Sequence, residues 1–248
     1  MRYRKGSISI GTGQDIPVLR QVLRSQYVTH DQLFEFMRLG CYELNRHTFN
    51  WRLRRLVKSG FLELNPAGHN CVYSIASAGA SLLAVTEEYC PVLKKKGQWE
   101  ASCYDHSLEL NELHLSLIRQ GVLEEWKSEV AIRSKNELTP DGYVKDYDAV
   151  VTVRLLGRTA SFALEYERTP KRPKDYLRIR SLLEREDRLH RFLYIVPNND
   201  LASFILECFT GTTAALFIGF VTDFGRSFTE MQVIQASSGV TKPILSAL

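Results

Sequence analysis

Several features that would assign this chain to a familiar class are missing from its sequence. Its five cysteines are an odd number and include no Cys-x-x-Cys pair, which argues against a disulfide framework or a zinc site and favours a reducing cytoplasm. The longest apolar run, Ala214–Val221, is interrupted by Gly219, and a membrane-spanning helix needs about 20 apolar residues. The basic N-terminus leads into no apolar stretch of the kind found in signal peptides. We therefore expect a cytoplasmic protein with no membrane partner.

Familiar catalytic motifs are missing as well. The sequence has no His-Glu-x-x-His motif and no serine nucleophile elbow, and the glycines of Gly11-Thr12-Gly13 precede no strand–helix phosphate loop. Its 44% hydrophobic and 24% charged residues are ordinary for a globular protein. A length of 248 residues allows one or two domains. General composition thus assigns no function.

Charge is divided unevenly along the chain. The first 96 residues contain 14 Lys and Arg but only 7 Asp and Glu, a net charge of +7, whereas the remaining residues have a net charge of −3. A basic first part is typical of a region that meets a polyanion such as DNA. A solvated surface without a binding function could also carry this excess of basic residues.

The first part of the chain has the pattern of a winged helix-turn-helix domain. Apolar residues recur at helical spacing in residues 15–25, 29–40 and 46–59. Two short strand-like segments within residues 61–75 then indicate a hairpin. Three short helices followed by a hairpin are the order of a winged helix-turn-helix, and we place this domain with its linker at residues 1–96.

The third expected helix carries the candidate DNA contacts. At 100° per residue, Phe49, Leu53 and Leu56 share one face, which must be the core face. On the opposite face, guanidinium groups can pair with guanine edges or phosphates, since such a helix fits the major groove. With the hairpin tip as a wing, the candidate DNA-binding residues are His47, Trp51, Arg54, Arg55, Lys58, His69 and Asn70.

Two alternatives stay open for this surface. The domain would serve protein contacts alone if its arginines were merely solvated, and a large exposed aromatic such as Trp51 equally marks a dimer contact. DNA binding predicts a strong dependence on salt, because phosphate contacts dominate the affinity.

The rest of the chain has the pattern of a mixed α/β domain. The expected order is a helix at 104–125, strands at 127–133, 148–154 and 160–167, a helix at 173–190, a strand at 191–197, a helix at 201–209 and a strand at 214–221. Such an order predicts a mixed sheet with helices on its faces, in a domain at residues 97–224. For residues 225–248 we expect an edge strand at 231–234 and a flexible C-terminal tail.

Carboxylates gather on the expected hairpin of this second domain. Glu165 and Glu167 are two residues apart on one strand and therefore share a face. A turn at Gly157-Arg158 brings Asp148 opposite them. Three converging carboxylates suit Mg²⁺, and metal-bound water can attack a phosphodiester. The basic residues that begin at Lys171 would hold the phosphate.

These segments resemble those of a known family. The strand–turn–strand with Asp148 and the run Glu165-Tyr166-Glu167 resembles the PD-(D/E)xK, or restriction-endonuclease-like, core. More narrowly, the chain resembles the plasmid replication-relaxation family, in which a winged helix precedes such a core. The matching stretches are residues 52–62, 106–114, 139–142 and 164–171. The resemblance implies an α/β fold (α+β overall) and a role in association with the DNA of plasmids or mobile elements.

The sequence departs from an active nuclease of this type. Glu167 replaces the lysine of the E-x-K motif, Lys171 lies four residues further on, and Asp141 competes for the place of the first aspartate. In an inactive site the carboxylates would pair with arginines such as Arg154 or Arg168. In an active site the catalytic residues would be Asp148, Glu165, Glu167 and Lys171, and the first three would bind Mg²⁺.

The sequence leaves three hypotheses of function. The preferred one is a double-stranded DNA-binding protein of a plasmid or mobile element, a homodimeric regulator or accessory factor whose nuclease-like domain has lost or altered its activity. The second is a Mg²⁺-dependent DNA endonuclease that its winged helix directs to a target. The third is an adaptor whose second domain binds another protein of the plasmid or mobile element.

Overall fold

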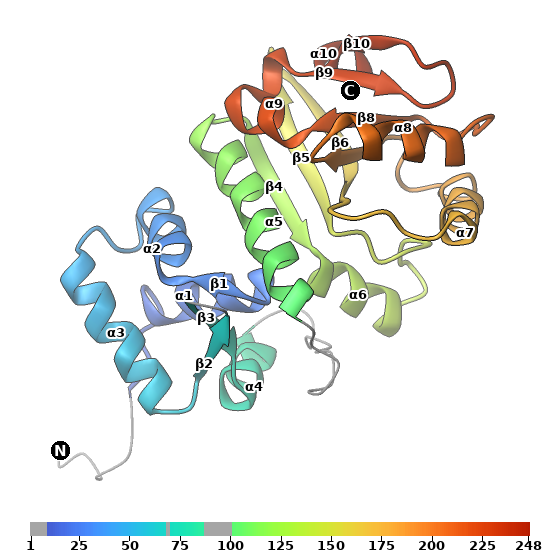
Figure 1. Ribbon diagram of the computed structural model, residues 1–248. Coiled ribbons are helices and arrows are strands. Elements are labelled where there is room, and N and C mark those ends of the chain that lie inside the picture. The colour runs from blue at the N-terminus through green and yellow to red at the C-terminus, as the bar shows by residue number, and fades with distance from the viewer. Residues whose placement is uncertain (1–8, 68–69, 87–100) are drawn as a thin grey trace, which may run out of the picture. The chain divides into compact units, whose positions relative to one another are not determined.

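The computed structural model describes residues 9–67, 70–86 and 101–248 (Figure 1). The chain divides into two compact units, Met1–Asn111 and Glu112–Leu248. The division lies within helix α5 (Ala101–Arg119), whereas the sequence suggested a boundary after residue 96. The fold is mixed α/β, with a three-stranded sheet in the first unit and a seven-stranded sheet in the second. No helix in the described ranges is both long and apolar enough to span a membrane.

The first unit surrounds a small antiparallel sheet with helices. Its elements are α1 (Asp15–Ser25), β1 (Val28–Thr29), α2 (His30–Leu39), α3 (Arg46–Lys58), β2 (Leu62–Ala67), β3 (Asn70–Ile75) and α4 (Ser77–Thr86). Strand β3 is central and pairs with both β1 and β2. The hairpin predicted after the third helix is present, and β1 is an additional strand that the sequence did not predict.

Local capping sets the start of the two helices that matter most here. Thr29 begins α2 with a capping box, because its hydroxyl accepts a hydrogen bond from the backbone N–H of Gln32 at 3.2 Å while the Gln32 side chain accepts from the Thr29 N–H. Asn45 begins α3, and its side-chain oxygen accepts from the backbone N–H groups of His47 and Thr48 at 2.9 and 3.2 Å. Both helices thus begin at a residue whose side chain caps them.

The second unit is built on a mixed seven-stranded sheet. Its elements after α5 are β4 (Leu123–Ser128), α6 (Glu129–Leu138), β5 (Ala149–Leu155), β6 (Arg158–Tyr166), α7 (Pro173–Leu183), β7 (Phe192–Val196), α8 (Asn199–Cys208), β8 (Leu216–Phe220), α9 (Val221–Arg226), the 3₁₀ turn η1 (Phe228–Glu230), β9 (Gln232–Gln235), β10 (Thr241–Pro243) and α10 (Ile244–Ala247). The strand order is β10-β9-β8-β7-β6-β5-β4. Strands β6, β7 and β8 are parallel to one another, and the other neighbours are antiparallel.

The two faces of this sheet carry different side chains. Helices α7 and α8 share one apolar cluster with Val150, Ala163 and Phe192 of the central strands, and Figure 1 shows both helices on that side of the sheet. Phe162, the neighbour of Ala163, faces the other way and stacks on Phe228 of η1. Because side chains alternate along a strand, Glu165 lies on the same face as Ala163, towards α7 and α8.

The structure corrects the sequence prediction at the start of the second unit. The expected helix at 104–125 ends at Arg119, before Gly121 with its φ of +68°. The first strand is β4, Leu123–Ser128, so the predicted strand at 127–133 is wrong beyond Ser128. Residues from Glu129 onward form α6, where the i,i+4 ion pair between Glu129 and Arg133 at 3.0 Å favours helix over strand.

The C-terminal prediction is wrong in a similar way. The predicted edge strand at 231–234 corresponds to β9, which pairs with β8 on one side and β10 on the other, so β10 is the edge. The expected flexible tail folds back, because Ile244 is fully buried and its N–H donates to the carbonyl of Met231 at 2.9 Å. The predicted helix at 173–190 is also shorter and ends at Leu183.

Candidate functional site

Helix α3 presents the first candidate surface. Phe49, Leu53 and Leu56 are at most 1% exposed, as the helical periodicity predicted. On the outward side His47, Trp51, Arg54 and Lys58 are all exposed, with 60% of Trp51 accessible. Within the ranges that the structure describes, neither Arg54 nor Lys58 forms an ion pair. These four residues are called the α3 surface below.

Three of the candidate DNA-binding residues are not part of this exposed set. Arg55 is half-buried, and its guanidinium donates to the carboxylate of Asp15 and to the carbonyl of Ser9. His69 lies outside the described residues. Asn70 begins β3, but its side chain also lies outside the described part. The structure thus brings together four of the seven predicted residues and holds Arg55 in an internal ion pair.

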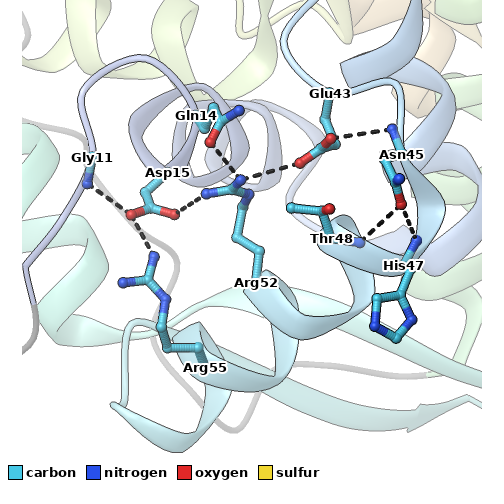
Figure 2. Close-up of polar contacts among 9 residues, drawn as sticks. All are labelled: Gly11, Gln14, Asp15, Glu43, Asn45, His47, Thr48, Arg52 and Arg55. Carbon is cyan, nitrogen blue, oxygen red and sulfur yellow. Dashed lines mark hydrogen bonds and ion pairs between the residues drawn. The ribbon is translucent and has the colours of Figure 1, made fainter.

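A buried polar network anchors α3 from its inner side, as Figure 2 shows. The Arg52 guanidinium donates to Asp15 at 2.9 Å, to Gln14 at 2.6 Å and to Glu43 at 3.1 Å. Burial alone raises the pKa of Asp15, but the hydrogen bonds from Arg55, Gly11 and Arg52 outweigh burial and lower that pKa below its ordinary value. The network ties α3 to the start of α1 and to the α2–α3 connection.

Sequence reasoning missed this network and two apolar neighbours of the α3 surface. Arg52 was considered only within a matching stretch, although its place four residues before Leu56 already set it near the buried face of the helix. Tyr42 and Leu44, just before α3, are 45% and 73% exposed. Their place in the short connection between two predicted helices was the available signal for them.

The second candidate site is the carboxylate cluster, which comprises Asp148, Glu165 and Glu167. Pairing of Ala149 with Leu164 sets Asp148, one residue before β5, opposite Glu165, as the sequence predicted. Glu165 and Glu167 are 5% and 4% exposed. Asp148 accepts a hydrogen bond from the Tyr166 N–H at 2.8 Å.

Two lysines contact the glutamates of the carboxylate cluster. The Lys145 ammonium contacts Glu165, and the Lys171 ammonium contacts both carboxylate oxygens of Glu167. Burial lowers the pKa of Lys145, but the charges of Glu165, Asp148 and Glu167 outweigh burial and raise it. Burial raises the pKa of Glu165 and of Glu167 despite these ammonium groups.

The other residues considered for this site lie elsewhere. Asp141, the competing first aspartate, is exposed and pairs with Arg188 at 2.9 Å. The expected partner Arg154 pairs with Glu124 instead. Asp148 therefore lies in the carboxylate cluster, and Asp141 does not.

The Mg²⁺ ion that the family resemblance implies does not fit this arrangement. Ammonium groups hold the carboxylate oxygens of Glu165 and Glu167 that would be metal ligands. Among the residues that the structure describes, no group of three or more His, Cys, Asp or Glu side chains is arranged to hold a metal ion. We derive no metal-dependent step from this site.

Tyr194 adds a buried hydroxyl beside the carboxylate cluster. It pairs with Glu165 in the parallel β6–β7 ladder, so both side chains lie on the same face of the sheet. Its side chain is fully buried, and its hydroxyl finds no hydrogen-bond partner among the described residues. Burial, with the nearby charges of Glu165 and Glu167, raises the pKa of this phenol.

Replacing Tyr194 with phenylalanine should leave the free energy of unfolding unchanged or raise it by up to about 1 kcal/mol, because a buried hydroxyl without a partner costs about 1–3 kcal/mol. Tyr147 is the matched control, since its hydroxyl donates to Glu186 at 3.0 Å. Tyr147→Phe should cost about 1.5–3 kcal/mol in urea unfolding. Equal losses in the two variants would show that the Tyr194 hydroxyl has a partner in solution.

Comparisons of this chain with protein-family models, with curated proteins and with solved structures found no match.

Proposed function

We propose that the first unit is a winged helix-turn-helix module that binds double-stranded DNA through the α3 surface. The observation that supports this most directly is the division of α3 into two faces. Phe49, Leu53 and Arg52 fix the inner face, while Arg54 and Lys58 project from the outer face without a partner in the described part of the chain. A helix fixed in this way can enter a major groove without losing contacts to the rest of its unit.

The order of elements in the first unit supports the same proposal. Helix α1, strand β1, helices α2 and α3 and the β2–β3 hairpin follow in the order of a winged helix. In such a module the third helix enters the major groove and the hairpin lies against the neighbouring backbone. The 13 residues of α3 span roughly 20 Å, enough to cross the groove.

For the whole chain we propose a regulator or accessory factor that acts on plasmid or mobile-element DNA as a homodimer. The second unit, in this proposal, has a nuclease-like fold without metal-dependent cleavage. The lysine contacts to Glu165 and Glu167 favour this role over that of an endonuclease.

A salt titration of binding tests the DNA proposal directly. Fluorescence anisotropy with a labelled 25–30 base-pair duplex should show binding whose logarithmic dependence on salt has a slope of about −3 to −5, since each phosphate contact adds about −0.9. An unlabelled duplex should compete for the same site. No binding at 50 mM salt, or binding that salt does not weaken, would refute the proposal.

Incubation with supercoiled plasmid separates this proposal from the endonuclease hypothesis. With Mg²⁺ or Mn²⁺ present, we expect wild-type protein to bind the plasmid without nicking it, because the carboxylates are already held by ammonium groups. Nicking that depends on the metal and disappears in Glu165→Ala would establish the endonuclease instead.

A further inference from the structure

The second unit balances the charge of two buried glutamates, Glu165 and Glu167, and of the half-buried Asp148 from within the chain. We propose that the ammonium groups of Lys145 and Lys171 take the place of a divalent cation in the carboxylate cluster, which makes this cluster a metal-independent element of the fold. The proposal concerns the second unit alone and does not depend on DNA binding by the first.

The first argument is the placement of the two ammonium groups. Lys145 contacts Glu165 and also donates to the backbone carbonyl of Asp146 at 3.2 Å, and its charge interacts with all three carboxylates. Lys171 contacts both oxygens of Glu167. Each glutamate thus has an ammonium partner of its own. Lys145 precedes β5 in the chain, and Lys171 follows β6.

The second argument is that Lys145 lies on a loop whose backbone is held in place. The side chain of Asn136 in α6 accepts from the N–H of Tyr143 at 2.6 Å and donates to Asp146 at 2.7 Å. A Cβ at Gly142 would lie 2.8 Å from the Asn136 Cα, so only glycine lets the loop approach the helix this closely. The loop is fixed on both sides of Lys145.

Glu186 supplies a second anchor for the same loop. Its carboxylate accepts from the N–H of Val144 at 3.1 Å and from the Tyr147 hydroxyl at 3.0 Å. The Tyr147 ring centroid in turn lies 5.1 Å from the Lys145 ammonium, within the range of a cation–π contact. Lys145 is therefore enclosed by a carboxylate, a carbonyl and an aromatic ring.

The third argument is the charge that remains. Three carboxylates and two ammonium groups leave a cluster that carries one negative charge at most, which is too little to attract a divalent ion out of water. An entering ion would also have to displace the Lys145 ammonium from Glu165, and the fixed loop would keep that positive charge close to the ion. Removing the Lys145 ammonium should make the carboxylate cluster negative enough to attract a divalent ion.

Titration with Mn²⁺, followed by the electron paramagnetic resonance signal of the free ion, tests the proposal. We expect the wild type and Lys145→Arg to show no saturable site tighter than about 1 mM. Lys145→Met should gain one Mn²⁺ per chain, and its unfolding temperature, lower than that of the wild type without metal, should rise as Mn²⁺ is added. Adding Glu165→Gln to Lys145→Met should abolish the gained site.

Two results would overturn the proposal. One is a wild-type chain that binds one Mn²⁺ well below 1 mM, a measurement that needs no variant and so remains decisive if Lys145→Met does not fold. The other is a folded Lys145→Met, verified by circular dichroism, that binds no more Mn²⁺ than the wild type.

Discussion

Replacing Arg54 and Lys58 with alanine should weaken binding to duplex DNA at least tenfold at 100 mM salt and reduce the slope of the salt dependence by about 1.8, because each lost phosphate contact removes about 0.9. Both side chains are exposed on the same side of α3, and neither has an ion-pair partner in the described part of the chain. Their removal breaks no ion pair in that part, so the loss should lie mainly in affinity rather than in stability. Anisotropy titrations between 50 and 300 mM salt measure both quantities.

A matched control distinguishes local contacts from net charge. Arg24 at the end of α1 and Arg38 at the end of α2 are also exposed arginines of the first unit. Arg24→Ala/Arg38→Ala removes the same charge and should change the affinity much less. Equal effects of the two double variants would mean that DNA meets the general field of the unit rather than the α3 surface.

The sequence predicted those parts of the first unit that depend on local signals. The buried face of α3 followed from the helical period of Phe49, Leu53 and Leu56, and helix α2 lies within the predicted range 29–40. Strand β1 has only two residues, too few for any periodicity, and exists because Val28 pairs with Tyr73 far along the chain. Such a strand is set by tertiary structure alone.

The carboxylate cluster shows the same limit at the level of side chains. Strand alternation and hairpin register were enough to predict that Asp148 and Glu165 meet. Their partners were not predictable, because Lys145 reaches Glu165 through a loop whose path depends on Asn136 and Glu186. The expected partner Arg154 pairs with Glu124 while Lys145 contacts Glu165, because no local pattern specifies which cation a folded loop delivers.

The helix at 129–138 was mistaken for a strand for a related reason. Val130 and Ile132 alternate with smaller or polar residues, as in a half-buried strand. Both are buried in the structure, but on a helix that the Glu129–Arg133 pair stabilises. A segment this short fits both the helical and the strand period, and its packing against the rest of the unit determines which structure forms.

Replacing Arg52 with methionine should destabilise the protein by about 3–5 kcal/mol, the usual cost of breaking a buried ion pair, because Glu43 loses the Arg52 guanidinium and Asp15 keeps Arg55 as its cation. The variant keeps the aliphatic volume but removes the hydrogen bonds to Asp15, Gln14 and Glu43. Arg54→Met on the exposed side of the same helix is the control and should change the free energy of unfolding by less than about 0.5 kcal/mol. Urea unfolding at pH 7 measures both variants.

The pH dependence of this loss identifies its cause. In the wild type the pKa of Asp15 is held below its ordinary value of 3.8, so its ion pairs stabilise the fold above that pH, and the stabilisation is lost as the pH falls through the lowered pKa. In Arg52→Met, Asp15 has lost one of its hydrogen-bond donors, so its pKa rises and its protonation costs the folded state less. The difference between wild type and variant should therefore be largest near pH 7 and narrow towards pH 3. A difference that stays constant across this range would attribute the loss to packing of the Arg52 side chain rather than to its charge.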